Sequence, residues 1–418
     1  MSKDILFQPL DLPNGTRLPN RLAKAAMEEN LADPGQIPGS RLERLYERWA
    51  QGGAGLLITG NVMIDPSALT GPGGVVLEAD SDIAPFAKWA EAARSNGAQV
   101  WMQINHPGRQ VYADMREEAV SPSDVAVAIP GFSALFGKPR ALTADEIPAL
   151  VTRFADAAAK AEEAGFTGVQ IHAAHGYLIS QFLSPLTNTR TDDWGGPLEN
   201  RARFLFDVIA AVRARVAPDF CVTFKLNSAD FQKGGFGIDD AKWVVQQVNT
   251  MQIDLVELSG GNYETPAMQG ISDDASSTLR REAYFIDFAR DIASVAQMPI
   301  MVTGGITRRA TAIEALMKDE AGFGVSVLGL ARALAFNPDL PNDWKANRNL
   351  DVTIPQIDWK IRTLSSLATM ATAKAQIERM AKGRPPKPGL SPILALLDER
   401  RNAFTRTRRY RRWRQTSR

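Results

Sequence analysis

The sequence is poor in the residues that mark several protein classes. It contains one cysteine, Cys221, and only three histidines among 418 residues. One thiol excludes a disulfide framework, and it excludes an iron–sulfur cluster, which generally takes four thiolates. No apolar run approaches the roughly 18 residues that a transmembrane helix needs. The first residues, Met1 to Asp4, lack the apolar run of a signal peptide, so we expect a cytoplasmic protein without a membrane span.

The sequence also lacks an excess of charge of either sign. Its 48 Lys and Arg residues nearly balance 47 Asp and Glu residues, which leaves a net charge of +1. Nothing in the overall charge therefore favours nucleic acid or an anionic membrane, and we expect a small-molecule substrate as the partner. With 44% hydrophobic residues the chain is long enough to bury a large α/β core.

Short apolar runs alternate with amphipathic segments over most of the chain, which is the pattern of parallel strands joined by helices. The expected strands are residues 21–25, 55–59, 99–104, 168–171, 221–226, 255–258, 300–303 and 325–328. One expected helix covers residues 143–164. The pattern predicts a (β/α)8 TIM barrel. A doubly wound sheet is disfavoured because no G-x-G-x-x-G follows the first strand, and polar residues suited to chemistry follow nearly every strand.

Two segments flank the repeated pattern. Residues 11–20, with Pro13-Asn14-Gly15 at their centre, predict a hairpin that plugs the N-terminal end of the barrel. We expect the catalytic barrel to cover residues 1–350 and a helical extension to cover 351–418, with helices at 357–381 and 390–403. Its arginine-rich end, 405–414, either packs on the barrel or a neighbouring subunit of a homo-oligomer, or binds nucleic acid. We favour packing and expect no nucleic acid.

Polar residues and glycines follow the expected strands, and a barrel brings them all to its C-terminal mouth. They are Met27 and Glu28, Gly60, Gln103 with His106 and Arg109, His172 with His175 and Tyr177, Lys225, the pair Gly304-Gly305, and Arg332. The glycine pair and the arginine after the last two strands predict a phosphate site. The amide of Gln103 and the charge of Lys225 suit a planar heterocycle with carbonyl and imide edges, such as a flavin.

Other interpretations of these residues stay open. His106, His172 and His175 could form a zinc site, although the sequence places no carboxylate beside them, and we expect no metal. His106 could instead cap the turn at Pro107-Gly108. Several aromatic residues could line a substrate pocket or serve ordinary packing: Tyr263, Tyr284, Phe285, Phe132 and Phe136.

The motifs together resemble the Old Yellow Enzyme family of FMN-dependent ene-reductases, over residues 5–345. The resemblance rests on Pro19-Asn20-Arg21 with Met27, Gly53 to Leu56 with Thr59, Gln103 to Arg109, Lys138-Pro139-Arg140, the block from His172 to Arg201, and Asn337 to Leu340. It implies bound FMN, NADH or NADPH as reductant, and an α,β-unsaturated carbonyl compound or a quinone as substrate. It implies that His172 and His175 hold the substrate carbonyl oxygen and that Tyr177 gives a proton to the α-carbon. Of the loop aromatics, we expect Tyr263 to bind the substrate.

The resemblance also implies the flavin contacts. Gln103 corresponds to the residue on the pyrimidine edge, and Lys225 stands where the family commonly has arginine. The phosphate contacts correspond to Gly304, Gly305 and Arg332, and the remaining expected contacts are Ala26, Met27, Glu28, Gly60, His172 and Ala331. Two positions depart from the family: Glu28 replaces a usual Thr or Cys, and Ala331 replaces a usual Gly.

Two further functions remain as alternatives. One is an FMN barrel that oxidises its substrate, as a dihydroorotate dehydrogenase does. The other is a flavin-binding or tail-mediated interaction protein without catalytic activity. Turnover of NAD(P)H with enones and quinones separates the expected enzyme from the second alternative.

Overall fold

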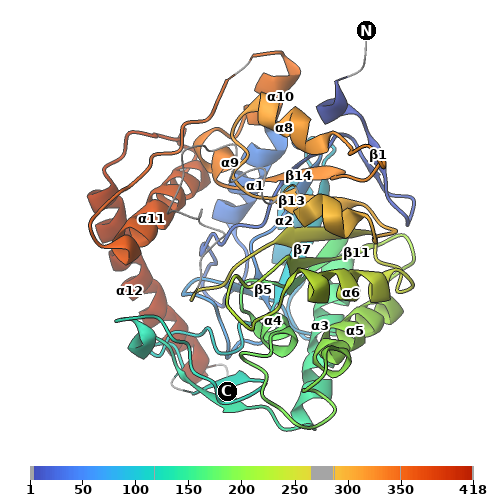
Figure 1. The fold of residues 1–418 in the computed structure, drawn as a ribbon. Coiled ribbons are helices and arrows are strands. Elements are labelled where there is room, and N and C mark those ends of the chain that lie inside the picture. Colours follow the sequence, from blue (N-terminus) through green and yellow to red (C-terminus); the bar gives the residue numbers. More distant parts are fainter. Residues whose placement is uncertain (1–3, 117, 265–285, 287, 349, 417–418) are drawn as a thin grey trace.

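The computed structural model describes residues 4–116, 118–264, 286, 288–348 and 350–416. Eight parallel strands form a closed ring: β3 (Leu22–Lys24), β4 (Leu56–Ile58), β7 (Gln99–Asn105), β10 (Gly168–Ala173), β11 (Cys221–Asn227), β12 (Leu255–Ser259), β13 (Ile300–Thr303) and β14 (Val327–Leu330). Figure 1 shows helices around these strands. The ring closes because β10 pairs with both β7 and β11. This closure confirms the (β/α)8 barrel and excludes a doubly wound sheet.

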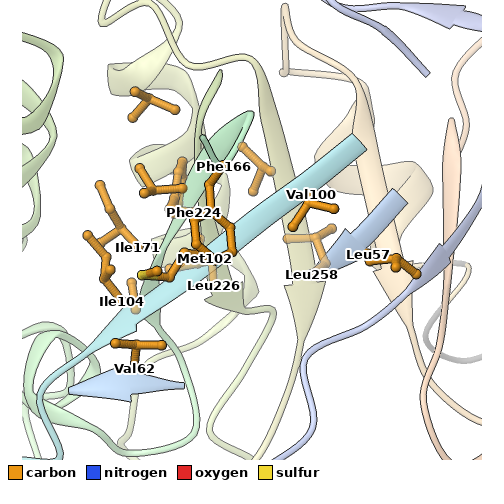
Figure 2. Close-up of a cluster of buried hydrophobic side chains, with 14 of the residues drawn as sticks. Leu57, Val62, Val100, Met102, Ile104, Phe166, Ile171, Phe224, Leu226 and Leu258 are labelled. Carbon is orange, nitrogen blue, oxygen red and sulfur yellow. The ribbon is translucent and has the colours of Figure 1, made fainter. Parts of the chain in front are cut away.

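Helices surround the ring in the order expected for β–α units. They are α1 (Ser40–Gln51), α2 (Ala84–Ala93), α3 (Glu146–Glu163), α4 (Leu178–Leu183), α5 (Leu198–Arg215), α6 (Ile238–Val248), α8 (Arg309–Leu316), α9 (Arg332–Phe336) and α10 (Leu340–Lys345). Outward-facing strand residues such as Val100, Met102 and Ile104 of β7 lie in the main hydrophobic core with residues of these helices, and Figure 2 shows part of that core.

Short elements complete the fold. The two-residue strand β5 (Val62–Met63) pairs with the last two residues of β7, and β6 (Val75–Val76) pairs with β5. Strand β8 (Glu118–Ser121) pairs with β9 (Lys138–Ala141). Single 3-10 turns lie at η1 (Ile5–Phe7) and η2 (Ser133–Leu135).

Several predicted boundaries were wrong by a few residues, including the start of the helix predicted from residue 357, which begins at Arg362, and two of these errors have a clear cause. The last strand begins at Val327, two residues later than predicted, because Val325 is buried beside the strand and resembles it in hydrophobicity. The helix predicted from residue 143 begins at Glu146. The Glu146 carboxylate still accepts the backbone N–H of Thr143 at 2.8 Å, with the spacing of a capping box, but Thr143 lies two residues before the N-cap residue, Asp145.

The barrel interior changes character along its axis. At the N-terminal end it is apolar and contains Trp101, Cys221, Leu255, Met301 and Val327. Side chains alternate between the two faces of a strand, so residues two positions further along also point inward. Those positions hold polar groups near the C-terminal end: Gln103, Thr223 followed by Lys225, Glu257 and Thr303. The alternation thus gives the barrel interior an apolar N-terminal end and a polar C-terminal end.

The predicted hairpin closes the apolar N-terminal end of the barrel. Strands β1 (Leu10–Asp11) and β2 (Arg17–Leu18) pair antiparallel, and Leu12 and Leu18 are buried against the apolar interior. The Asn14 amide at the tip donates to the carbonyl of Asp219 at 2.8 Å and contacts Cys221 Sγ at 3.2 Å. The plug is therefore confirmed, and it leaves the C-terminal mouth as the open end.

The C-terminal segment forms two long helices, α11 (Arg362–Ala381) and α12 (Pro392–Thr416), which lie along one side of the barrel in Figure 1. Helix α11 packs on α1 and α9, and α12 packs along α11. Helix α12 extends 13 residues beyond the predicted end at residue 403, through the arginine-rich tail. Arginine is a good helix former and no glycine or proline interrupts the run, which explains the extension.

The arginine-rich tail contacts the barrel of its own chain. The Tyr410 hydroxyl donates to the carbonyl of Pro66 at 2.9 Å, and Arg409 and Arg411 each donate to a backbone carbonyl, of Ala32 and Asp114 respectively, at 2.5 Å. Tyr410 is buried against Met63, Leu69 and Val76. The tail therefore packs on loops around the mouth. Within the described part of the chain, none of the helices has the length and apolar character needed to cross a membrane.

Candidate active site

Three ring side chains meet where β10 ends. The His172 ring lies 4.8 Å from the Tyr177 ring and 5.1 Å from the His175 ring, both edge-on. The chain makes this approach by turning tightly, with His175 at φ 60° and Gly176 at φ 73°. Asn227 holds the turn by accepting the backbone N–H of His175 at 3.1 Å. A strained, left-handed residue beside two other polar rings is a feature of functional sites.

Both imidazoles are neutral hydrogen-bonding groups. Burial lowers the pKa of each well below its ordinary value, and the charge of Lys225 lowers it further. His172 Nδ1 accepts the backbone N–H of Ala174 at 3.2 Å, which leaves the proton on Nε2 and makes that nitrogen a donor. His175 Nε2 lies 2.8 Å from Ser259 Oγ, so its Nδ1 is the nitrogen left for a ligand.

Tyr177 is a buried phenol. Burial raises its pKa well above the ordinary value, and the charge of Glu28 raises it further, so the hydroxyl stays protonated at neutral pH. Its oxygen lies 2.9 Å from the hydroxyl of Tyr263. Phe136 lies 6.1 Å from the Tyr263 ring and stacks on Tyr112 at 5.4 Å, which forms an aromatic wall. Tyr284 and Phe285 lie outside the described residues.

A continuous polar chain crosses the barrel below these rings. Gln103 Nε2 donates to Gln170 Oε1 at 2.7 Å, and Gln170 Nε2 donates to Glu257 Oε2 at 2.7 Å. The other carboxylate oxygen of Glu257 lies 2.8 Å from Lys225 Nζ and accepts from Thr303 Oγ1 at 2.6 Å. Gln103 and Lys225 were predicted from the sequence, whereas Gln170 and Glu257 were not. These two residues could have been predicted from the sequence, because each is a polar residue at an inward-facing position of an otherwise apolar strand.

Glu28 lies between the mouth and the C-terminal extension. It accepts a hydrogen bond from Thr70 Oγ1, and its carboxylate lies 3.5 Å from Lys374 Nζ of α11. Burial by itself would lower the pKa of Lys374, but the charges of Glu28 and Glu399 raise it overall. Burial raises the pKa of Tyr112 in the aromatic wall, and the charge of Glu28 raises it further. The extension therefore contacts a predicted site residue, which the sequence pattern did not indicate.

Gly60 is held by a buried polar cluster. Its backbone N–H donates to Glu29 Oε1 at 3.1 Å and to the Tyr46 hydroxyl at 3.0 Å. Lys24 Nζ contacts the same two groups, and burial lowers the pKa of Lys24 to about 8. A Cβ at position 60 would come within 2.0 Å of Glu29, so the position requires glycine. Since its N–H is already bonded, Gly60 could approach a cofactor only through its other atoms.

The predicted phosphate residues follow neighbouring strands. Gly304 and Gly305 come directly after β13, and Arg332 begins α9 directly after β14. The turn is tight, with Gly305 at φ 56° and the N–H of Ile306 bonded to the carbonyl of Gly304 at 2.7 Å. Burial lowers the pKa of Arg332. Ala331, between β14 and Arg332, has a negative φ of −105°, so it does not adopt the left-handed conformation that favours glycine.

The residues Ala26 and Met27 follow β3 at the same mouth. Ala26 packs against the apolar interior of the barrel, and Met27 packs against the outer core. Both positions are half-buried, which is compatible with contact to a ligand in the mouth.

The described histidines do not assemble a metal site. His106 Nδ1 accepts the backbone N–H of Gly108 at 3.0 Å, so His106 caps its own loop, and its Nε2 lies 3.9 Å from Asp65. Among the residues that the structure places, no group of three His, Cys, Asp or Glu side chains could hold a metal ion. Arg109 is bound to Glu264 at 2.7 Å.

Comparisons with known proteins found a matching family and similar folds. The profile of the NADH:flavin oxidoreductase / NADH oxidase family matches residues 5–351. An NADH-dependent flavin oxidoreductase of Hypocrea jecorina (strain QM6a) is 37% identical over 86% of this chain and 95% of its own length. Morphinone reductase in complex with tetrahydroNAD superposes with a TM-score of 0.68 at 26% identity, covering 83% of this chain and 92% of that one. An old yellow enzyme homologue from Zymomonas mobilis gives a TM-score of 0.69 at 25% identity, covering 84% and 95%.

Proposed function

Because the chain belongs to the NADH:flavin oxidoreductase / NADH oxidase family, we propose that it reduces the activated C=C bond of α,β-unsaturated carbonyl compounds, and also quinones. It is a flavin oxidoreductase with FMN as cofactor and NADH or NADPH as reductant. The observation that carries the proposal is the meeting of two neutral imidazoles and one protonated phenol at the mouth of the barrel. Such a set can bind a carbonyl oxygen and protonate a neighbouring carbon.

The residues at the mouth fit FMN in their chemistry. Gln103 and Lys225 would hold the heterocycle, because an amide and a cation match its carbonyl and imide edge. The Gly304-Gly305 turn and Arg332 would hold the phosphate, in the position where TIM barrels bind phosphate groups. When bound, FMN supplies the hydride chemistry.

The protein's own groups would activate the substrate. Nε2 of His172 and Nδ1 of His175 donate to the carbonyl oxygen, and these bonds strengthen as negative charge develops there. They withdraw electron density and make the β-carbon a better hydride acceptor. Tyr177 then gives its phenolic proton to the α-carbon, and the hydroxyl of Tyr263 at 2.9 Å is placed to return one.

Half-reactions measured separately test the proposal. The purified protein is reduced without oxygen by NADH or NADPH, and its visible flavin absorbance is followed after mixing with an enone. We expect reoxidation of the flavin together with a saturated carbonyl product. Reoxidation by no enone or quinone would favour a flavin-binding protein without catalytic activity. Flavin reduction by an organic substrate in place of NAD(P)H would favour a dehydrogenase.

Replacing Arg332 by alanine should weaken FMN binding. A charge-assisted contact to phosphate is worth about 1.5–3 kcal/mol, so the FMN dissociation constant should rise about 10- to 150-fold. Flavin occupancy after purification and fluorescence titration measure the effect. Riboflavin, which has no phosphate, is the control ligand, and its affinity should be the same for the variant and the parent protein. Full FMN occupancy in the variant would assign the phosphate to other residues.

Glu28→Gln should raise the midpoint potential of the flavin. A carboxylate near the flavin disfavours the negative charge of its reduced form, and Lys374 at 3.5 Å offsets only part of that charge. We expect a rise of the order of 10 mV, measured against a reference dye. Lys374→Met should shift the potential in the opposite direction. Unchanged potentials in both variants would place Glu28 outside the field of the flavin.

We also infer that the protein forms a homo-oligomer. The supporting observation is a row of exposed apolar side chains on α12: Ile393, Leu394, Leu397 and Phe404. A second copy could cover this face. Light scattering on the purified protein measures the assembly mass.

A further inference from the structure

Glu257 is the most deeply placed ionisable residue of the polar chain inside the barrel. It lies on β12, is 0% exposed, and contacts groups from β10, β11 and β13 through its two oxygens. Both flavin-site residues predicted inside the barrel are linked to it. Lys225 bonds to it directly, and Gln103 does so through Gln170. No step of the proposed mechanism uses this carboxylate.

The carboxylate fixes the direction of the hydrogen bonds. An ionised carboxylate can only accept, so Gln170 must turn its NH2 group toward Glu257. Its carbonyl oxygen then faces Gln103, which must turn its own NH2 group toward Gln170. The carbonyl oxygen of Gln103 is thereby directed away from Gln170. An amide locked in this direction presents an acceptor to a ligand N–H.

The same carboxylate sets the net charge beside the site. Lys225 Nζ lies 2.8 Å from Glu257, and both side chains are almost completely buried. In the interior such a pair is much less screened than at the surface. The cation that faces the flavin region is therefore largely compensated, and an uncompensated Lys225 would attract negative charge more strongly.

We propose that Glu257 is a positioning residue of the flavin site, which orients the Gln103 amide through Gln170 and compensates the charge of Lys225. It acts on the ligand through these residues and does not touch it. This inference rests on the proposed placement of Gln103 and Lys225 at the flavin. It does not depend on which substrate the reduced enzyme uses.

Glu257→Gln tests the inference, because it keeps the shape and removes the charge. A glutamine has one carbonyl oxygen where the carboxylate has two acceptors, and it leaves Lys225 without its counter-ion. Because reduced FMN is anionic, we expect the ratio of the dissociation constant of oxidised FMN to that of reduced FMN to rise about tenfold. This ratio corresponds to a rise in midpoint potential of about 30 mV. Fluorescence titration of oxidised FMN and potentiometry with a reference dye give the two quantities. An unchanged potential would overturn the charge role.

Two further variants separate positioning from folding. Gln170→Leu breaks the chain without changing charge, so it should weaken oxidised and reduced FMN equally and leave the potential unchanged. The double variant Glu257→Gln/Lys225→Gln removes the whole ion pair, which is less destabilising than burying one unpaired charge. It should fold and restore a potential close to that of the parent protein. A potential in the double variant equal to that of Lys225→Gln alone would overturn the inference.

Failure of this inference is distinguishable from failure of the proposed function. If Arg332→Ala loses FMN while Glu257→Gln keeps the parent potential, the flavin site stands and the role of Glu257 is wrong. If the potentials shift as expected but enones are not reduced, Glu257 has its role and the proposed substrate class is wrong.

Discussion

Tyr177→Phe should slow enone reduction by about 10²–10⁴-fold, the range typical of a lost general acid. The phenol is protonated at neutral pH because burial raises its pKa, and phenylalanine keeps the ring but has no proton to give. Binding of FMN and its reduction by NAD(P)H should be nearly unchanged, because neither needs this proton. Stopped-flow absorbance of each half-reaction measures both effects.

Quinones are the matched control for Tyr177. Their reduction requires no protonation at carbon, so quinone turnover should largely survive in Tyr177→Phe. Replacing His172 or His175 by alanine should instead weaken the binding of carbonyl ligands generally, including phenols that resemble the enolate. Equal loss of rate with enones and quinones would show that Tyr177 positions the substrate and is not the proton donor.

Removing the chain after residue 350 should destabilise the protein severely. The truncation strips α11 and α12 from the barrel, and with them the bond from Arg44 to the carbonyl of Ala381 at 2.8 Å and the ion pair between Lys374 and Glu28. Apolar surface of α1 and α9 would become exposed to water. We expect a lower melting temperature, aggregation and stronger binding of a hydrophobic dye. A soluble, fully active truncated chain would contradict a structural role for the extension.

Point variants make this test independent of truncation. Ile377 on α11 is 3% exposed, whereas Met370 on the same helix is 40% exposed. Ile377→Ala should lower the free energy of unfolding by about 2–5 kcal/mol, while Met370→Ala should change it by less than about 1 kcal/mol. Urea unfolding followed by circular dichroism measures the difference. Tight binding of RNA or DNA by the full chain at physiological salt would revive the nucleic-acid hypothesis for the arginine tail.

The sequence by itself determined the barrel and the residues after its strands. Strands buried on both faces are continuous apolar runs, so their number and order are visible without a structure. All parallel strands of one closed barrel end at one mouth, which is why His172, Lys225 and Arg332 could be placed together. The close spacing of His172, His175 and Tyr177 in sequence made their cluster predictable as well.

Only the tertiary structure decided which side chains pair. The periodicity of a strand tells which face Glu257 occupies, but its partners lie on the adjacent strands β11 and β13 and, one strand further away, on β10. The ion pair between Glu28 and Lys374 likewise joins the two ends of the chain. A hydrogen bond or an ion pair depends on distances of a few ångströms between atoms remote in sequence, and local pattern carries no information about such distances.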